Sequence, residues 1–178
     1  RKASGFDAFN SRSRNQWQAA FSAQTGTVKR LYGSSSQPYK GTPEAGAHAF
    51  LQSSHALFGL KSGLADLTIQ QVTTTAKRRH VRFQQTLNGA AIEGAQVIVH
   101  SDEQGRVTMV QNDSLDTVEP ANEDTLAPEA ARDIARDDLR VQLGPDANLS
   151  ASTVEKIIAR YSEEQRYVWK VSTPAQNP

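Results

Sequence analysis

Residues 80–100 read HVRFQQTLNGAAIEGAQVIVH, and this stretch decides the fold because it predicts a pair of antiparallel strands. Apolar and polar residues alternate on both sides of Asn88-Gly89, as they do in strands that bury one face. Asn-Gly is typical of a hairpin turn, although Ala90 and Ala91 after it indicate a loop longer than two residues. Gly94 lies inside the second strand and predicts a β-bulge there.

The histidines at the two ends of this stretch are candidate metal ligands. A hairpin centred near residue 90 would bring His80 and His100 to face each other. Two ligands alone make a poor zinc site, and the nearby Asp102 and Glu103 leave only a weak site open. A cross-strand polar pair is the favoured interpretation.

Strand alternation divides the first strand between two faces. One face is the more apolar and is expected to pack on a helix; its members are Val81, Phe83, Gln85 and Leu87. Gln85 then needs a buried hydrogen-bond partner, for which the backbone at the Gly94 bulge is a candidate. Arg82 and Gln84 point the other way, which makes them better candidates for contact with a partner than Phe83.

The rest of the chain predicts further helices and strands. Thr42 is a suitable cap and Pro43 a suitable first residue for a helix that Gly59 ends. Its buried stripe is expected to be Ala47, Phe50, Leu51, Ser54, Leu57 and Phe58. Strands are predicted over 67–74, 79–87, 91–100 and 106–111, and a first hairpin over 17–32 follows a loose arm at 1–16.

The carboxyl-terminal part predicts a second helix and a second hairpin. The helix covers 128–143 and is expected to bury Ala130, Ala131, Ile134, Ala135 and Leu139. Strands are predicted over 154–161 and 167–171, and residues 172–178 are expected to be unstructured. The fold class is therefore α+β: two small modules, each an antiparallel sheet packed on a helix.

Composition excludes several classes of function. The chain has 178 residues, 37% of them hydrophobic, a formal net charge of +1 and no cysteine. We expect no nucleic-acid partner and no membrane span, and a disulfide or a cysteine nucleophile is excluded. His48 and His55 lie seven residues apart on one helix, about 10 Å, which is too far to share one ion. No group of residues forms a catalytic constellation, and we expect no enzyme activity.

Residues 80–113 resemble the fungalysin/thermolysin propeptide (FTP) module. The residues that match it are His80, Val81, Arg82, Phe83, Gln84, Gln85, Asn88, Gly89, Gly94, Ala95, Val97, Val99, His100, Gly105 and Val107. The resemblance implies structural roles in the motif for Phe83, Gln85, Asn88, Gly89, Gly94 and Gly105.

Residues 123–171 resemble the PepSY module, a cystatin-like fold that usually follows. The expected division is an arm and hairpin at 1–40, an FTP-like module at 41–115, a linker at 116–127 and a truncated PepSY-like module at 128–178. Modules of this kind normally continue into one more strand, and the chain starts at Arg1 without a methionine. We therefore expect a cut or trimmed piece of a longer precursor.

These resemblances imply the pro-region of a secreted zinc metalloprotease of the thermolysin or fungalysin type. Such a region performs no chemistry; it helps the catalytic domain to fold and keeps it inactive. Its partner is the cognate catalytic domain, to which the zinc and calcium belong, and no cofactor is expected in this chain. The candidate contact residues are Arg82 and Gln84 on the hairpin and Val171, Ser172, Thr173 and Pro174 in a flexible carboxyl-terminal stretch.

Two alternatives remain open. One is a free-standing PepSY/FTP module that regulates extracellular proteases. The other is a cystatin-like inhibitor of cysteine proteases, because residues 85–89, QTLNG, are close to the hairpin tip of that family. Trp169 would then stand in a second wedge loop.

Overall fold

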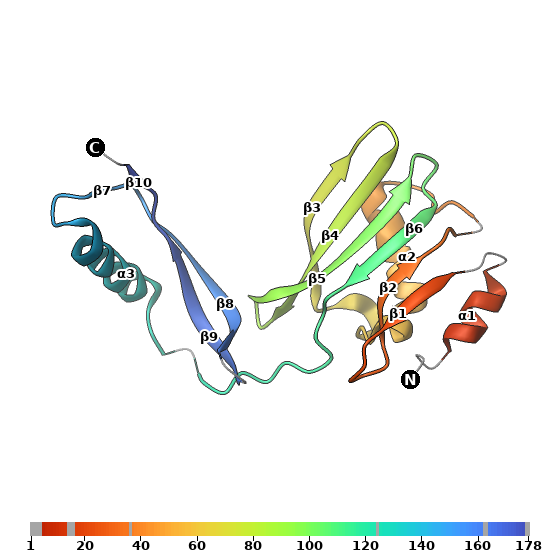
Figure 1. The fold of residues 1–178 in the computed structure, drawn as a ribbon, viewed down its shortest axis with the longest axis horizontal. Helices are drawn as coiled ribbons and strands as arrows, with labels where there is room; N and C mark the ends of the chain where they lie inside the picture. Colours follow the sequence, from red (N-terminus) through yellow and green to blue (C-terminus); the bar gives the residue numbers. More distant parts are fainter. Residues whose placement is uncertain (1–4, 14–16, 36, 124, 162–163, 177–178) are drawn as a thin grey trace. The chain divides into compact units, whose positions relative to one another are not determined.

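The chain divides into two compact units with an α+β fold (Figure 1). The computed structural model describes residues 5–13, 17–35, 37–123, 125–161 and 164–176. The first unit contains residues 1–87 and 94–117, and the second contains residues 88–93 and 118–178. No helix in the described ranges is both long and apolar enough to cross a bilayer.

The first unit is built on a sheet in the order β1-β2-β6-β5-β4-β3. These strands are β1 (Gln18–Phe21), β2 (Val28–Tyr32), β3 (Leu67–Thr74), β4 (Arg78–Leu87), β5 (Ala90–Asp102) and β6 (Val107–Asn112). The four strands predicted between 67 and 111 are confirmed to within two residues at each end. The amino-terminal hairpin is not a separate segment, because β2 pairs antiparallel with β6.

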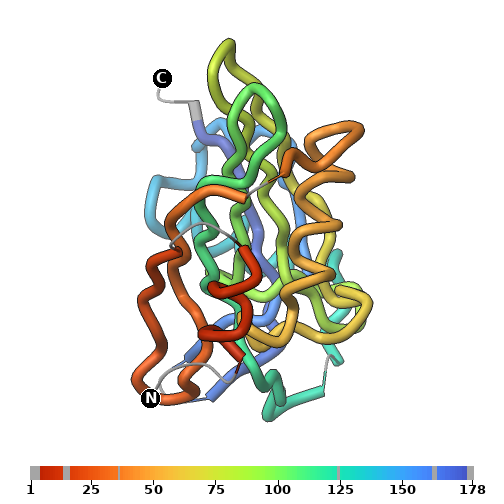
Figure 2. The backbone as a smooth tube through the Cα atoms, turned by 90° about the vertical axis from the view of Figure 1, so that its right-hand side faces the viewer, coloured from red at the N-terminus to blue at the C-terminus, as the bar shows by residue number. Residues whose placement is uncertain are grey.

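The helices α1 (Phe6–Arg12) and α2 (Pro43–Phe58) lie on the same side of this sheet (Figure 2). The prediction of a loose arm at 1–16 is wrong for the described part of it. Phe6 is buried and meets Phe21 edge to face at 5.4 Å, and Phe9 packs against Trp17 and Phe50. Residues 1–4 and 14–16 lie outside the described residues.

The helix α2 has the predicted boundaries. The side chain of Thr42 accepts a hydrogen bond from the Ala45 amide, Pro43 is the first residue, and Gly59 ends the helix with φ 69°. All six residues of the predicted stripe are buried. They form the core with Val81 and Phe83 of β4 and with the inward side chains of β5 and β6. A short 3-10 helix, η1 (Ser62–Leu64), leads into β3.

The hairpin of β4 and β5 turns on Asn88-Gly89 alone. β4 ends at Leu87 and β5 begins at Ala90, so the prediction of a longer loop is wrong. Asn88 and Gly89 have φ values of +51° and +80°, as both central residues of a tight type I′ turn require. Gly94 has φ +74° within β5, a left-handed conformation of the kind that begins a bulge.

The second unit combines α3 (Pro128–Leu143) with β8 (Thr153–Tyr161) and β9 (Glu164–Ser172), which form an antiparallel pair. β8 also runs parallel to the start of β5, pairing Ala91 with Ile157 and Ile92 with Ile158. The sequence predicted antiparallel pairs only.

The helix α3 has its predicted boundaries but not its predicted burial. Ala131 is buried, whereas Ile134 is 62% exposed. Ala130, Ala135 and Leu139 are half-buried, so part of the predicted stripe stays in solvent.

The carboxyl-terminal stretch is ordered up to residue 176, which corrects the prediction for 172–178. β10 (Ala175–Gln176) pairs with β7 (Asn148–Leu149). The carbonyl oxygen of Pro174 accepts a hydrogen bond from the Ser150 amide at 2.9 Å, and the hydroxyls of Thr173 and Ser152 lie 2.7 Å apart. Residues 177–178 lie outside the described residues.

The predicted linker at 116–127 contains no helix or strand among its described residues, but it is held against β9. The Ala121 amide donates to the Gln165 carbonyl oxygen at 2.8 Å. The side-chain amide of Asn122 bonds to both the N–H and the C=O of Tyr167, at 2.8 and 3.1 Å. Asn122 thus substitutes for one residue of a neighbouring strand.

Asn112 offers a test of the packing between the sheet and α2. It is fully buried, and its amide donates to the carbonyl oxygens of Val28 and Phe58 at 3.0 and 2.8 Å. Asn112→Ala removes both of these buried hydrogen bonds and should lower the free energy of unfolding by about 2–4 kcal/mol. Urea denaturation measures this, with the half-buried neighbour Gln111→Ala as the control, expected within about 1 kcal/mol of the unsubstituted chain. Equal losses in both variants would contradict the assignment.

Candidate protein-binding face

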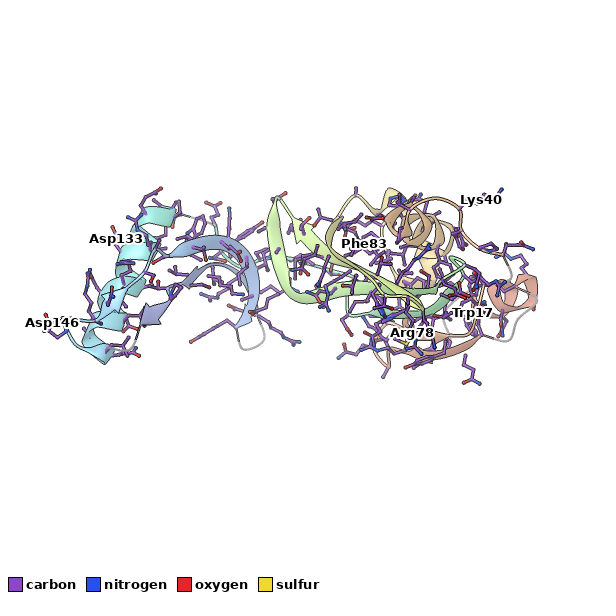
Figure 3. All side chains as sticks on the ribbon, turned by 90° about the horizontal axis from the view of Figure 1, so that it is seen from above. Trp17, Lys40, Arg78, Phe83, Asp133 and Asp146 are labelled. Carbon is purple, nitrogen blue, oxygen red and sulfur yellow. The ribbon has the colours of Figure 1, made fainter. Side chains whose placement is uncertain are left out.

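Among the described residues of the first unit, one face of the sheet carries no helix. We call it the uncovered face, and its central residues are His80, Arg82 and Gln84 of β4 and Gln96, Ile98 and His100 of β5. Figure 3 shows Phe83 on the opposite side of the sheet, where α2 lies. The predicted alternation along β4 is confirmed, since Val81 and Phe83 are each 1% exposed.

A network of side-chain hydrogen bonds crosses the uncovered face. The Arg82 guanidinium donates to Gln96 Oε1 at 2.7 Å. Gln96 Nε2 donates in turn to Gln84 Oε1 at 3.2 Å and to Gln70 Oε1 at 3.1 Å. Each amide is oriented by the next, so the polar groups of this face are fixed before any partner arrives.

Gln84 is less accessible than its place on this face suggested. Only 8% of it is exposed, and its Nε2 donates to the carbonyl oxygen of Ala95, beside Gly94, at 3.0 Å. Gln84 lies on the uncovered face, as predicted, but the expectation that it is accessible to a partner is wrong. Arg82 is half-buried, and its guanidinium donates to Gln96.

Gln85 is buried on the other face, as predicted, but its partners differ from the prediction. Its Oε1 accepts from the Leu115 amide at 2.9 Å, and its Nε2 donates to the Leu115 carbonyl oxygen at 2.9 Å. The same Nε2 donates to Asp66 Oδ2 at 3.1 Å. The backbone beside Gly94 is taken by Gln84 instead. Leu115 lies 30 residues away in the sequence, where no local pattern indicates a partner.

His80 and His100 face each other across β4 and β5. Their Nδ1 atoms are 2.6 Å apart and the rings meet edge to face at 4.5 Å. Burial and then the positive charges of His80 and Arg78 lower the pKa of His100 to about 4. The cross-strand polar pair is confirmed. The described residues contain no group of three or more His, Asp or Glu placed to hold a metal ion.

The carboxyl-terminal candidates lie in the second unit. Val171 and Ser172 end β9, and Thr173 and Pro174 connect it to β10. Val171 lines an open groove of about 610 Å³ between α3, β9 and the linker, together with Trp169 and Ile134. Sequence reasoning missed this groove, although the wide apolar stripe of α3 beside so few strands was a signal for it.

Part of the first unit matches a known protein family. The family model described as the Fungalysin/Thermolysin Propeptide Motif matches residues 65–114, which include β3 to β6 with the network and the histidine pair. Residues 65–114 are thus similar to a fungalysin/thermolysin propeptide motif. The sequence resemblance of residues 80–113 is thereby confirmed.

Outside this motif, the chain has only low similarity to proteins of known structure. The solved structure of the Bacillus megaterium YpeB C-terminal domain aligns over 99% of this chain and 89% of its own length, with 10% identity and a TM-score of 0.39. That likeness supports no conclusion about function. Among curated proteins, none matches the chain significantly.

Gly105 of the propeptide motif has a measurable structural role. It has φ +86°, and a Cβ there would lie 2.7 Å from the Tyr39 carbonyl oxygen. Gly105→Ala should cost about 2–4 kcal/mol of unfolding free energy, because strain and a backbone clash add. Gly63 has φ +82° and open space around it, so Gly63→Ala isolates the strain alone, about 1 kcal/mol. If thermal unfolding shows the same loss of stability for both variants, the clash at Gly105 is contradicted.

Proposed function

We propose that this chain is the non-catalytic pro-region of a secreted zinc metalloprotease of the thermolysin or fungalysin type. A propeptide module is non-catalytic, and the observation that supports this proposal is the propeptide motif at 65–114. The pro-region assists the folding of the catalytic domain and inhibits it until it is removed. Zinc and calcium belong to the catalytic domain, and this chain needs neither.

The uncovered face is the surface best suited to hold the protease. Arg82 is already oriented by Gln96, so less conformational entropy is lost when it binds a partner. A guanidinium with free N–H groups pairs with carboxylates in fixed geometry. Ile98 lies half-buried between Gln96 and His100 on the same strand, and it adds an apolar contact beside the arginine, a combination that interface centres favour.

Both roles follow from binding one folded surface. Secreted proteases are often protected by high barriers between the unfolded and native states. A partner that binds the folding transition state lowers that barrier, and the same partner blocks the active-site cleft if it stays bound. The strand end from Val171 to Pro174 is a second candidate contact, because an extended segment can pair with a strand of the protease.

The structure argues against the cystatin-like alternative. In that family the hairpin tip must enter the cleft of a cysteine protease, and here the equivalent tip would be residues 85–89. Gln85 is 4% exposed, and Asn88 donates a hydrogen bond to the Tyr167 hydroxyl at 3.2 Å. Directly after the tip, Ala91 and Ile92 are paired with β8. The side chains of Gln85 and Asn88 are therefore bonded within the chain itself, although Asn88 and Gly89 are exposed.

Inhibition and binding assays test this proposal. The purified chain should inhibit the catalytic domain encoded with it, with an affinity better than about 1 μM, and should not inhibit papain. Arg82→Ala should weaken binding at least about tenfold, or ~1.4 kcal/mol. Arg140→Ala, on the exposed side of α3, should leave the affinity unchanged. Absence of both complex and inhibition would overturn the proposal.

A further inference from the structure

The contact between His80 and His100 can form only in certain protonation states of the two imidazole rings. The contact between the two Nδ1 atoms needs one of them to carry a hydrogen and the other to be bare. With one extra proton the contact persists as a shared hydrogen bond. With both imidazoles protonated, each Nδ1 carries a hydrogen and the two cations repel at 2.6 Å. The pair therefore closes only when at least one of its histidines is neutral.

The described residues that pair with the two histidines carry no negative charge that could compensate a second positive charge. His80 faces Thr73 on β3, and His100 faces Met109 on β6, neither of which can be ionised. On β4, Arg78 and Arg82 alternate onto the same face as His80 and Arg79 directly precedes it, and all three are cations. At the end of β5 lies Asp102, whose carboxylate is 3.8 Å from Arg106 and accepts hydrogen bonds from the amides of residues 104 and 106.

His100 carries a second cost of protonation. Its Nε2 is buried and has no hydrogen-bond partner among the described residues. A protonated imidazole places a hydrogen on both nitrogens, so this buried atom would become an unpaired donor on a cation. The neutral state of His100 is thus favoured by geometry on both sides of the ring.

We propose that the His80–His100 pair is an acid-sensitive latch that holds the ends of β4 and β5 together and weakens the protease-binding face when it opens. The link to binding rests on the proposed function, whereas the latch itself does not. His80 and Arg82 alternate on the same side of β4, so separation of the rings displaces the strand that carries Arg82. Acidification then loosens the uncovered face without any chemical cleavage.

The pH range follows from the sign of the shift. The pKa of His100 is lowered from 6.5 to about 4 in the folded chain. An opened state titrates at the higher value, so it takes up protons first as the pH falls. The stability of the latch is complete above pH 6.5, declines between pH 6.5 and 4, and is constant below that range. At pH 5 the opening equilibrium should be raised by up to about 30-fold.

Amide hydrogen exchange on the isolated chain tests the latch directly. Protection factors at Val81 and Val99, which flank the histidines, should fall by about 10- to 30-fold between pH 7.5 and pH 5. His100→Phe retains an aromatic ring against His80 and removes the titrating group, so its protection factors should change less than threefold. His48→Gln, at an exposed position on α2, should behave like the unsubstituted chain. If His100→Phe fails to fold, His80→Phe serves the same purpose.

Binding to the catalytic domain tests the regulatory consequence. The ratio of the affinities of the unsubstituted chain and His100→Phe is measured at each pH, because this ratio cancels titration of the protease. It should fall at least fivefold from pH 7.5 to pH 5. Protection factors with the same pH dependence in both chains would overturn the latch. If the protection factors change with pH but the affinity ratio stays constant, the latch is not coupled to binding. If the chain does not bind the catalytic domain at any pH, the proposed function is refuted, and hydrogen exchange alone then decides whether the latch exists.

Discussion

The hydrogen bonds between the buried side chain of Gln85 and the backbone of Leu115 are the constraint on which the first unit depends. Gln85 meets both polar backbone groups of Leu115 and also Asp66, so its side chain cannot turn outward without leaving buried groups unpaired. Strand alternation then determines the rest of β4. Val81 and Phe83 are fixed against α2, and the intervening residues are fixed on the opposite face.

The neighbouring Gln84 organises the side chains of the uncovered face through its hydrogen bonds. Its amide joins Ala95 to Gln96, and Gln96 orients Arg82. Two adjacent residues of the same type therefore fix both the core and the surface, because each faces a different environment. The polar side chains of the uncovered face must remain hydrogen-bonded to one another, and these hydrogen bonds orient them for a partner. The histidine pair closes the far end of the same two strands.

Local sequence patterns predicted the helices and strands whose formation depends on neighbouring residues. The caps and stripe of α2 and the alternation of β3 to β6 placed these elements almost at their observed bounds, and the propeptide residues indicated the motif. The prediction failed where distant contacts decide. The short helix α1 is held by Phe21 and Phe50, residues outside its own segment. The partners of Gln85, the parallel pairing of β8 and the ordered strand β10 likewise depend on distant residues.

The site was predicted in part for the same reason. Alternation correctly placed Arg82 on the uncovered face, but it does not reveal that Gln84 is enclosed by its neighbours. It also did not show how closely His80 and His100 approach. Exposure of Ile134 followed from the small number of strands beneath α3, a property of the assembled unit and not of the helix sequence.

The chain contains no cysteine, so a single introduced cysteine can report where the protease binds. A fluorophore at Gln111→Cys would lie beside Ile98 on the uncovered face, since these residues are paired across β5 and β6. A matched fluorophore at Glu44→Cys would lie on α2, on the opposite side of the sheet. On titration with the catalytic domain, a saturable change in emission is expected at position 111 and none at position 44. A complex that changes only the probe on α2, or neither probe, would contradict binding at the uncovered face.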